Sequence, residues 1–142
     1  MEESVLFLDD DHERCQAFLL RQTDATIVRC AADAIALLKS RCWSEVHLDH
    51  DLNGGTYEDP QEKNTGIEVV RYIVCDRPDV RTFVVHSHNE RSGPVMVGAL
   101  ESAGYRVVYA PFRFMSSGYR HRAHDDVWAS NITYNLDPYG DT

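Results

Sequence analysis

The fold is decided by the stretch Val46-His47-Leu48-Asp49-His50-Asp51-Leu52-Asn53-Gly54-Gly55. Its apolar start, Val46 to Leu48, predicts a buried β-strand, and acidic residues follow before two glycines turn the chain. Unpaired charges are costly to bury, so Asp49 and Asp51 are expected at the edge of a sheet, where strands meet loops. In open α/β sheets this edge is the usual place for a ligand.

The rest of the chain alternates between short apolar runs and amphipathic segments. Further strands are expected at 4–8, 25–30, 81–85 and 105–110, and helices at about 12–22, 31–38, 65–77 and 96–103. This alternation predicts an α/β fold with a doubly wound, five-stranded parallel sheet and helices on both faces. We expect residues 1–112 to form this domain. Residues 113–142 break the rhythm, and we expect an irregular C-terminal extension packed on the domain or acting as an arm.

Composition narrows the functional classes. The chain of 142 residues has a net charge of −9, which argues against general nucleic-acid binding, because that affinity comes from Lys and Arg. The four cysteines are scattered without a Cys-x-x-Cys pair, as is typical of thiols in a reducing cytosol. We find neither a signal peptide nor an apolar run long enough to span a membrane, and we therefore predict a cytoplasmic location without membrane contact.

Acidic side chains follow two of the predicted strands. Because the carboxyl ends of parallel strands lie together, Asp9 and Asp10 should meet Asp49 and Asp51. Such carboxylates repel one another unless a cation is present. We therefore predict these four as ligands of a divalent metal, Mg²⁺ or Mn²⁺, although any one aspartate could equally cap a helix.

Two histidines flank a serine after the fourth strand. His86 and His88 are two residues apart, so both would project from one face of an extended chain. Either could serve as a metal ligand or as a general acid or base. Ser87 lacks a Gly-x-Ser-x-Gly context, which disfavours a Ser-His-Asp hydrolase. We expect His12 and His47 to be ordinary surface or core residues.

Several short motifs together resemble the receiver domain of response regulators. Val5-Leu6-Phe7-Leu8-Asp9-Asp10-Asp11 is similar to the first strand and acidic pair of that family, and Leu48-Asp49 falls where its phosphoacceptor aspartate ends the third strand. Thr65-Gly66-Ile67-Glu68 resembles the Asp-Gly-Ile-Glu that opens the third helix, and Ser87 falls at its Thr/Ser position. The resemblance implies a flavodoxin-like receiver fold. It also implies Mg²⁺ held by Asp9, Asp10, Asp49 and the backbone carbonyl of Asp51.

The departures from this family matter as much. Ala110-Pro111-Phe112 replaces Lys-Pro-Phe, so the lysine that pairs with the phosphoryl group is absent. The combined pattern resembles divergent stand-alone receiver-like proteins of phages and bacterial conflict systems, which implies the host cytoplasm if the chain is phage-encoded. Asp49-x-Asp51-x-x-Gly54 also resembles the topoisomerase-primase metal motif. We rank that fold second, because its first strand is followed by a glutamate and here aspartates stand there.

Three functions are compatible with this edge. A phospho-switch would use Asp49 as nucleophile. A metal-dependent phosphoesterase would use Asp49, Asp51, His86, Ser87 and His88 around the metal. A binding module, such as a ligand sponge or sensor, would hold a phosphorylated ligand without chemistry. We favour a metal-dependent phosphoesterase whose partner is a phosphorylated small molecule or a partner protein.

Overall fold

The computed structural model describes residues 4–54, 63–87 and 89–110. Strands and helices alternate along the chain, as the sequence predicts. The order is β1 (Val5–Leu8), α1 (His12–Arg21), β2 (Thr26–Val28), α2 (Ala31–Ser40), β3 (Trp43–Leu48), α3 (Gly66–Asp76), β4 (Val80–Val85), α4 (Ser92–Ser102) and β5 (Arg106–Tyr109).

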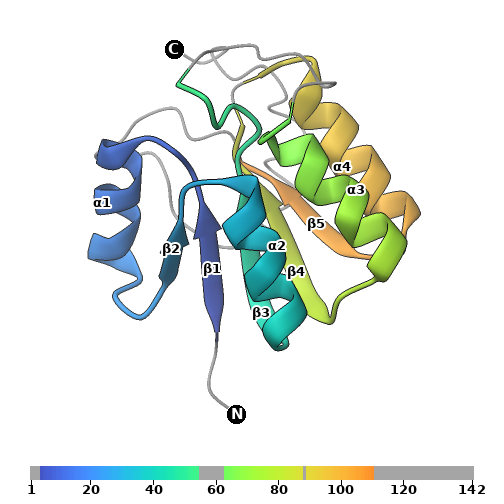
Figure 1. Cartoon of the computed structure of the whole chain (residues 1–142), viewed down its shortest axis with the longest axis horizontal. Coiled ribbons are helices and arrows are strands. Elements are labelled where there is room, and N and C mark those ends of the chain that lie inside the picture. The colour runs from blue at the N-terminus through green and yellow to red at the C-terminus, as the bar shows by residue number, and fades with distance from the viewer. Residues whose placement is uncertain (1–3, 55–62, 88, 111–142) are drawn as a thin grey trace.

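The strands form one parallel sheet of five, in the order β2-β1-β3-β4-β5 (Figure 1). The register pairs Leu8 with Leu48 and Leu48 with Val85, so that β1, β3 and β4 end level with one another in the middle of the sheet. The first residue after each strand is still bonded to the neighbouring strand. Asp49 N–H donates to the Leu8 carbonyl and His86 N–H to the Leu48 carbonyl, at 3.1 and 2.9 Å. The predicted doubly wound α/β fold is therefore confirmed.

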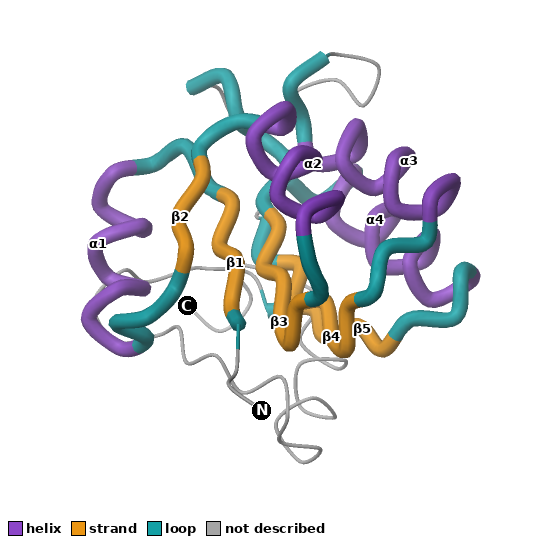
Figure 2. The backbone as a smooth tube through the Cα atoms, turned by 60° about the horizontal axis from the view of Figure 1, so that its bottom comes forward, coloured by secondary structure: helices purple, strands orange, loops and turns teal. Residues whose placement is uncertain are grey.

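Helices cover both faces of the sheet. Helices α2, α3 and α4 lie side by side over one face, whereas α1 stands apart from them (Figure 2). Helix α1 packs through Phe18, whose ring is stacked on Phe7 with the centroids 4.2 Å apart. Strand β1 is buried on both faces, which is the reason for its continuous apolar run.

Helix α3 begins unusually close to the edge of β3. Thr65 caps the helix by accepting a hydrogen bond from Glu68 N–H, as the sequence predicts. Gly66 N–H donates to the His50 carbonyl at 2.9 Å. A Cβ atom on Gly66 would lie 2.1 Å from the Asp49 carbonyl oxygen and 2.7 Å from the Cα of His50. Glycine is therefore the residue that allows the helix to start here.

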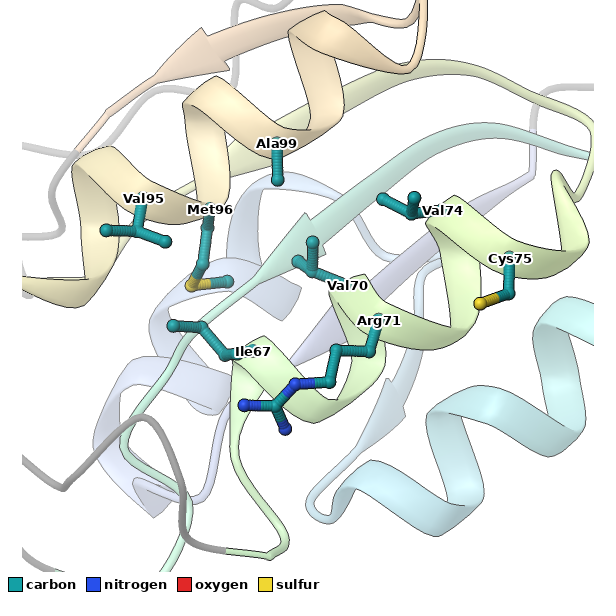
Figure 3. Close-up of a pocket in the computed structure, with 8 residues that line it drawn as sticks. All are labelled: Ile67, Val70, Arg71, Val74, Cys75, Val95, Met96 and Ala99. Atoms are coloured by element: carbon teal, nitrogen blue, oxygen red, sulfur yellow. The ribbon is translucent and has the colours of Figure 1, made fainter.

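A groove with a cavity volume of about 550 Å³ separates α3 from α4 (Figure 3). Most of its lining is aliphatic, and Val74 and Val95 on its walls are 41% and 56% exposed. The groove is lined by Ile67, Val70, Arg71, Val74, Cys75, Val95, Met96 and Ala99. It lies on the helical layer, so it is separate from the sheet edge where the acidic residues gather.

Residues 113–142, the predicted C-terminal extension, lie outside the described residues. Within the described part of the chain, none of the helices has the length and apolar character needed to cross a membrane. The cytoplasmic location stays a prediction.

Candidate functional site

Three of the predicted residues come together at the carboxyl edge of the sheet. Asp9 follows β1, Asp49 follows β3 and His86 follows β4. All three are buried, and each offers a ligand atom within 4.8 Å of the other two. Strand β3 separates β1 from β4, so Asp49 stands at the centre of the cluster and Asp9 and His86 flank it.

Four donors saturate the Asp9 carboxylate. Its Oδ1 accepts from the N–H of Asp11 at 2.9 Å and from Nη2 of Arg14 at 3.0 Å. Its Oδ2 accepts from Nε of Arg14 at 2.7 Å and from Nε2 of His86 at 3.0 Å. Burial by itself would raise the pKa of Asp9, but the hydrogen bonds and charges of His86 and Arg14 outweigh it and lower the pKa to about 2. Asp9 is therefore negatively charged at neutral pH and holds Arg14 and His86 in place.

Arg14 is a member of the site that the sequence analysis missed. Asp11 caps α1 by accepting a hydrogen bond from Arg14 N–H, and this places the arginine in the first turn, directly above the sheet edge. Its Nη2 also lies 3.6 Å from Oδ2 of Asp49. Burial would lower the pKa of the guanidinium, but the pair with Asp9 raises it, so Arg14 stays charged. One signal in the sequence could have indicated Arg14: an arginine lies in the first turn of a helix that directly follows a strand with an acidic end.

Asp49 is less well compensated than Asp9. Its Oδ1 accepts from the His50 N–H at 2.9 Å. Its Oδ2 is buried and has no hydrogen-bond partner among the residues that the structure describes. Burial and the charge of Asp9 hold the pKa of Asp49 well above its ordinary value, against the opposing charge of Arg14. Asp49 is thus the group at this edge that a bound cation or a hydrogen-bond donor would stabilise most.

The His86 ring is held in one orientation. It stacks on Phe7 with the centroids 4.8 Å apart and an angle of 4° between the planes. Because the Asp9 carboxylate can only accept, Nε2 of His86 carries the proton in their 3.0 Å hydrogen bond. In the neutral ring Nδ1 then holds the lone pair. Burial lowers the pKa of His86 against the opposing effect of Asp9, which favours the neutral, basic form at neutral pH.

Asp10, Asp51 and Ser87 lie outside the cluster of Asp9, Asp49 and His86 and hold the surrounding loops. Asp10 Oδ2 accepts from the Gly54 N–H at 2.8 Å. Asp51 Oδ1 accepts from Nδ2 of Asn89 at 3.2 Å, and Ser87 Oγ accepts from the Asn89 N–H at 3.0 Å. These bonds connect the loop after β4 to the loop after β3, and the loop after β3 to the loop after β1.

Of the other histidines near the sheet edge, His47 and His50 are buried and contact neighbouring residues. His88 lies outside the described residues. His47 is buried on β3 and its Nε2 lies 3.0 Å from Oε1 of Glu45, in agreement with a core role. His50 is also buried and its Nδ1 accepts from the Ile67 N–H at 3.3 Å, so its ring turns toward the start of α3. At the end of β5, Ala110 N–H donates to the Val85 carbonyl at 2.8 Å.

An acidic residue at the centre of the edge of a β2-β1-β3-β4-β5 sheet, with a second acid beside it, defines a receiver-type domain. Solved structures agree on the fold. The signal receiver domain assigned to a Luxo repressor protein of Vibrio parahaemolyticus is 13% identical with a TM-score of 0.64, over 94% of each chain. The non-phosphorylated HemR receiver domain of Leptospira biflexa is 14% identical with a TM-score of 0.60, over 94% of this chain and 95% of that chain. The Mn²⁺-bound form of response regulator Rcp1 is 17% identical with a TM-score of 0.55, over 92% of this chain and 89% of that chain.

The family is more specific than the fold. Residues 4–102 match the family described as the cyclic-phosphate processing receiver domain, which is more than half of the 142 residues. The chain therefore belongs to this family and is a divergent receiver domain. None of the curated proteins matches it.

Receiver domains bind Mg²⁺ or Mn²⁺ at their acidic site, and the structural neighbour Rcp1 is a Mn²⁺-bound form. The donors found here fit such an ion in kind, because two carboxylates and one imidazole within 4.8 Å suit Mn²⁺. The buried Oδ2 of Asp49 also lacks a hydrogen bond within the described residues. Arg14, however, already neutralises Asp9, so an ion that binds Asp9 must take over bonds that Arg14 now makes.

Proposed function

We propose that this site hydrolyses a cyclic phosphodiester with the help of a divalent ion, Mn²⁺ or Mg²⁺. The observation that carries the proposal is the convergence of Asp9, Asp49 and His86, all buried and within 4.8 Å of one another. Its support is membership of a family described as cyclic-phosphate processing. In this reaction the oxygen of one water molecule bonds to phosphorus, one ester P–O bond of the ring breaks, and the freed oxygen takes up a proton.

In this proposal His86 is the general base. Its lowered pKa keeps the ring neutral, and its Nδ1 takes the proton from the attacking water. Asp9, which holds Nε2–H, stabilises the imidazolium that forms. A base placed in this way is worth roughly 10²–10⁴-fold in rate. The base then returns the proton to the freed oxygen.

In this proposal the acidic residues hold the metal ion. Asp49 would hold the ion, with Asp10 and the backbone carbonyl of Asp51 as further ligands, while Asp9 stays bonded to Arg14 and His86. A bound divalent ion neutralises these acids and polarises the phosphoryl group. Ser87 and His88 would contact the phosphoryl oxygens from the end of β4. The resemblance to receiver-like proteins of phages and conflict systems leads us to place the substrate among cyclic-phosphate signals of phage–host conflict.

The test is a panel of 2′,3′-cyclic and 3′,5′-cyclic mononucleotides, cyclic dinucleotides and a generic aryl phosphodiester, with Mn²⁺, Mg²⁺ or EDTA. Products are separated by anion-exchange chromatography and identified by ³¹P NMR. We expect metal-dependent ring opening that Asp49→Ala and His86→Ala abolish. His12→Gln, a change of an exposed histidine in α1, is the matched control. Turnover that survives both Asp49→Ala and His86→Ala would refute the assignment.

A second candidate is a module that binds a cyclic phosphate without hydrolysing it. One observation favours it, since Arg14 neutralises Asp9 through two hydrogen bonds, so that part of the acidic edge is balanced without a metal ion. In that case the same assay gives tight binding and unchanged ligand after denaturation of the protein. A switch that stores a phosphoryl group on Asp49 is disfavoured because Ala110 replaces the lysine of the receiver family.

A further inference from the structure

We propose that Arg14 binds the phosphoryl group of the substrate and takes the part that the fifth-strand lysine has in the receiver family. The inference rests on the proposed function and deepens it. It names the residue that recognises the phosphoryl group, and it specifies a singly charged diester as the preferred ligand.

The guanidinium of Arg14 is bound to Asp9 along one edge only. Nε and Nη2 donate to the two oxygens of Asp9 at 2.7 and 3.0 Å. Within the described residues, these bonds leave the Nη1 end of the group available. The side chain is 25% exposed, whereas Asp9 is fully buried. A ligand that enters from solvent therefore meets the outer edge of a guanidinium whose inner edge is already fixed.

The guanidinium of Arg14 also lies beside the least compensated acid of the site. Its Nη2, which donates to Asp9, is 3.6 Å from Oδ2 of Asp49, which is longer than a hydrogen bond but close enough for electrostatic contact. A phosphoryl oxygen that accepts from Arg14 would therefore place its phosphorus next to the Asp49–His86 pair. The cation and the reacting groups converge on the same small space.

Arg14 is also held in place before the ligand arrives. Asp11 caps α1 through Arg14 N–H at 2.9 Å and fixes the backbone, and the two-point bond to buried Asp9 fixes the side chain. Arginine donates two parallel hydrogen bonds to phosphate, and a guanidinium that is already ordered loses little entropy on binding. At the end of β5, Ala110 stands where the receiver family has its lysine.

Charge selects the form of the ligand. A phosphodiester carries one negative charge, whereas a ring-opened monoester carries about −1.5 to −2 at pH 7. Arg14 already shares its single positive charge with Asp9, so it compensates the first negative charge of a ligand better than a second. We therefore infer that the site prefers the cyclic diester to its own hydrolysis product and favours product release.

The experiment measures binding with EDTA present, so that it is independent of turnover. The probes are dimethyl phosphate, which is a singly charged diester, methyl phosphate, which carries a second charge, and 2′,3′-cyclic AMP. Binding is followed by the ¹⁵N–¹H signal of Arg14 Nε and by calorimetry. The variants are Arg14→Lys, which keeps the charge opposite Asp9, Arg14→Gln, and Arg21→Gln as the control on the exposed end of the same helix.

We expect Arg14→Lys and Arg14→Gln to weaken binding of 2′,3′-cyclic AMP by roughly 10–100-fold, the range for a lost hydrogen bond to a charged group. The preference for dimethyl over methyl phosphate should disappear, and Arg21→Gln should leave both unchanged. If Arg14 served only to neutralise Asp9, Arg14→Lys would bind all probes as the wild type does, and that result would overturn the proposal. An Arg14 Nε signal that no probe shifts in the wild type would overturn it as well.

The two proposals fail in different ways. If wild-type protein binds the diesters through Arg14 but never opens a ring with any metal, hydrolysis is refuted and phosphoryl recognition by Arg14 stands. If rings are opened and the Arg14 variants keep the affinity and preference of the wild type, Arg14 recognition is refuted and hydrolysis stands.

Discussion

Replacing the two central acids, one at a time and in EDTA, should change stability in opposite directions. Asp9→Asn should destabilise the protein, because Arg14 and His86 lose a charged partner that four hydrogen bonds hold in place. Asp49→Asn should stabilise it, because the carboxyl of Asp49 is buried beside Asp9 and has an oxygen without a hydrogen bond among the described residues. Sequence reasoning treats all acids at this edge alike and expects relief of repulsion from any of these changes.

The magnitude for Asp9 follows from its pKa. A fall from the ordinary 3.8 to about 2 corresponds to roughly 2.4 kcal/mol at pH 7. Leaving Arg14 without its partner adds to this, so we expect a loss of roughly 2–4 kcal/mol in the free energy of unfolding. For a chain of this length that is a fall in Tm of roughly 7–15 °C. For Asp49 we predict the direction only, a higher Tm.

Both effects depend on pH, with opposite signs. Since the pKa of Asp9 is lowered on folding, its stabilisation is complete above pH 3.8 and is lost as the pH falls through about 2. Since the pKa of Asp49 is raised on folding, its carboxyl stabilises the fold below pH 3.8 and this contribution is lost as the pH rises through the raised value. Urea unfolding at pH 7 and at pH 3 measures both. Equal destabilisation by Asp9→Asn and Asp49→Asn at pH 7 would refute this reasoning.

The remaining predictions concern metal, phosphorylation and pH. Calorimetry with Mn²⁺ should show about one site, absent in Asp49→Ala, because Asp49 has a buried oxygen without a hydrogen bond among the described residues. Unchanged binding in Asp49→Ala would contradict this. Acetyl phosphate should leave no lasting adduct on Asp49, because Ala110 replaces the phosphoryl-pairing lysine; a stable mass increase would instead support a phospho-switch. The rate constant kcat/KM should fall as the pH drops through the lowered pKa of His86, because the general base becomes protonated. Asp9→Asn should move that fall to still lower pH, because the charge of Asp9 raises the pKa of His86. A pH profile that Asp9→Asn does not shift would count against the Asp9–His86 pair.

The sheet and the meeting of acids could be predicted from the sequence, because both follow from local patterns. Apolar runs ending in aspartate indicate strands, and alternation with helices makes them parallel. The start of β3 was harder to predict from the sequence, because the strand begins at Trp43 and not at Val46. Glu45 suggests a loop when read alone. In the fold Glu45 is buried beside His47 on the same face of β3, and its Oε1 lies 3.0 Å from Nε2 of His47.

The pairings within the site could not be predicted in the same way. Asp9 and His86 follow strands that are not neighbours, so their hydrogen bond depends on the order of strands in the sheet. The role of Arg14 depends on how α1 turns above that edge, which Asp11 fixes by capping the helix. Asp10 and Asp9 are adjacent in sequence, yet Asp10 reaches Gly54 while Asp9 reaches Arg14 and His86. Residue type gives the chemistry, and only the packing assigns the partners.

The tight contact at Gly66 has a consequence for how related sequences are interpreted. Any side chain at this position would push the start of α3 away from the backbone of Asp49 and His50, and the central acid would move with it. A relative could therefore keep every acid and histidine of the site and still lose its geometry through one substitution in a residue that has no functional group. When new genomes are searched for active members of the family, the residue that aligns with Gly66 is a more sensitive criterion than the number of aspartates.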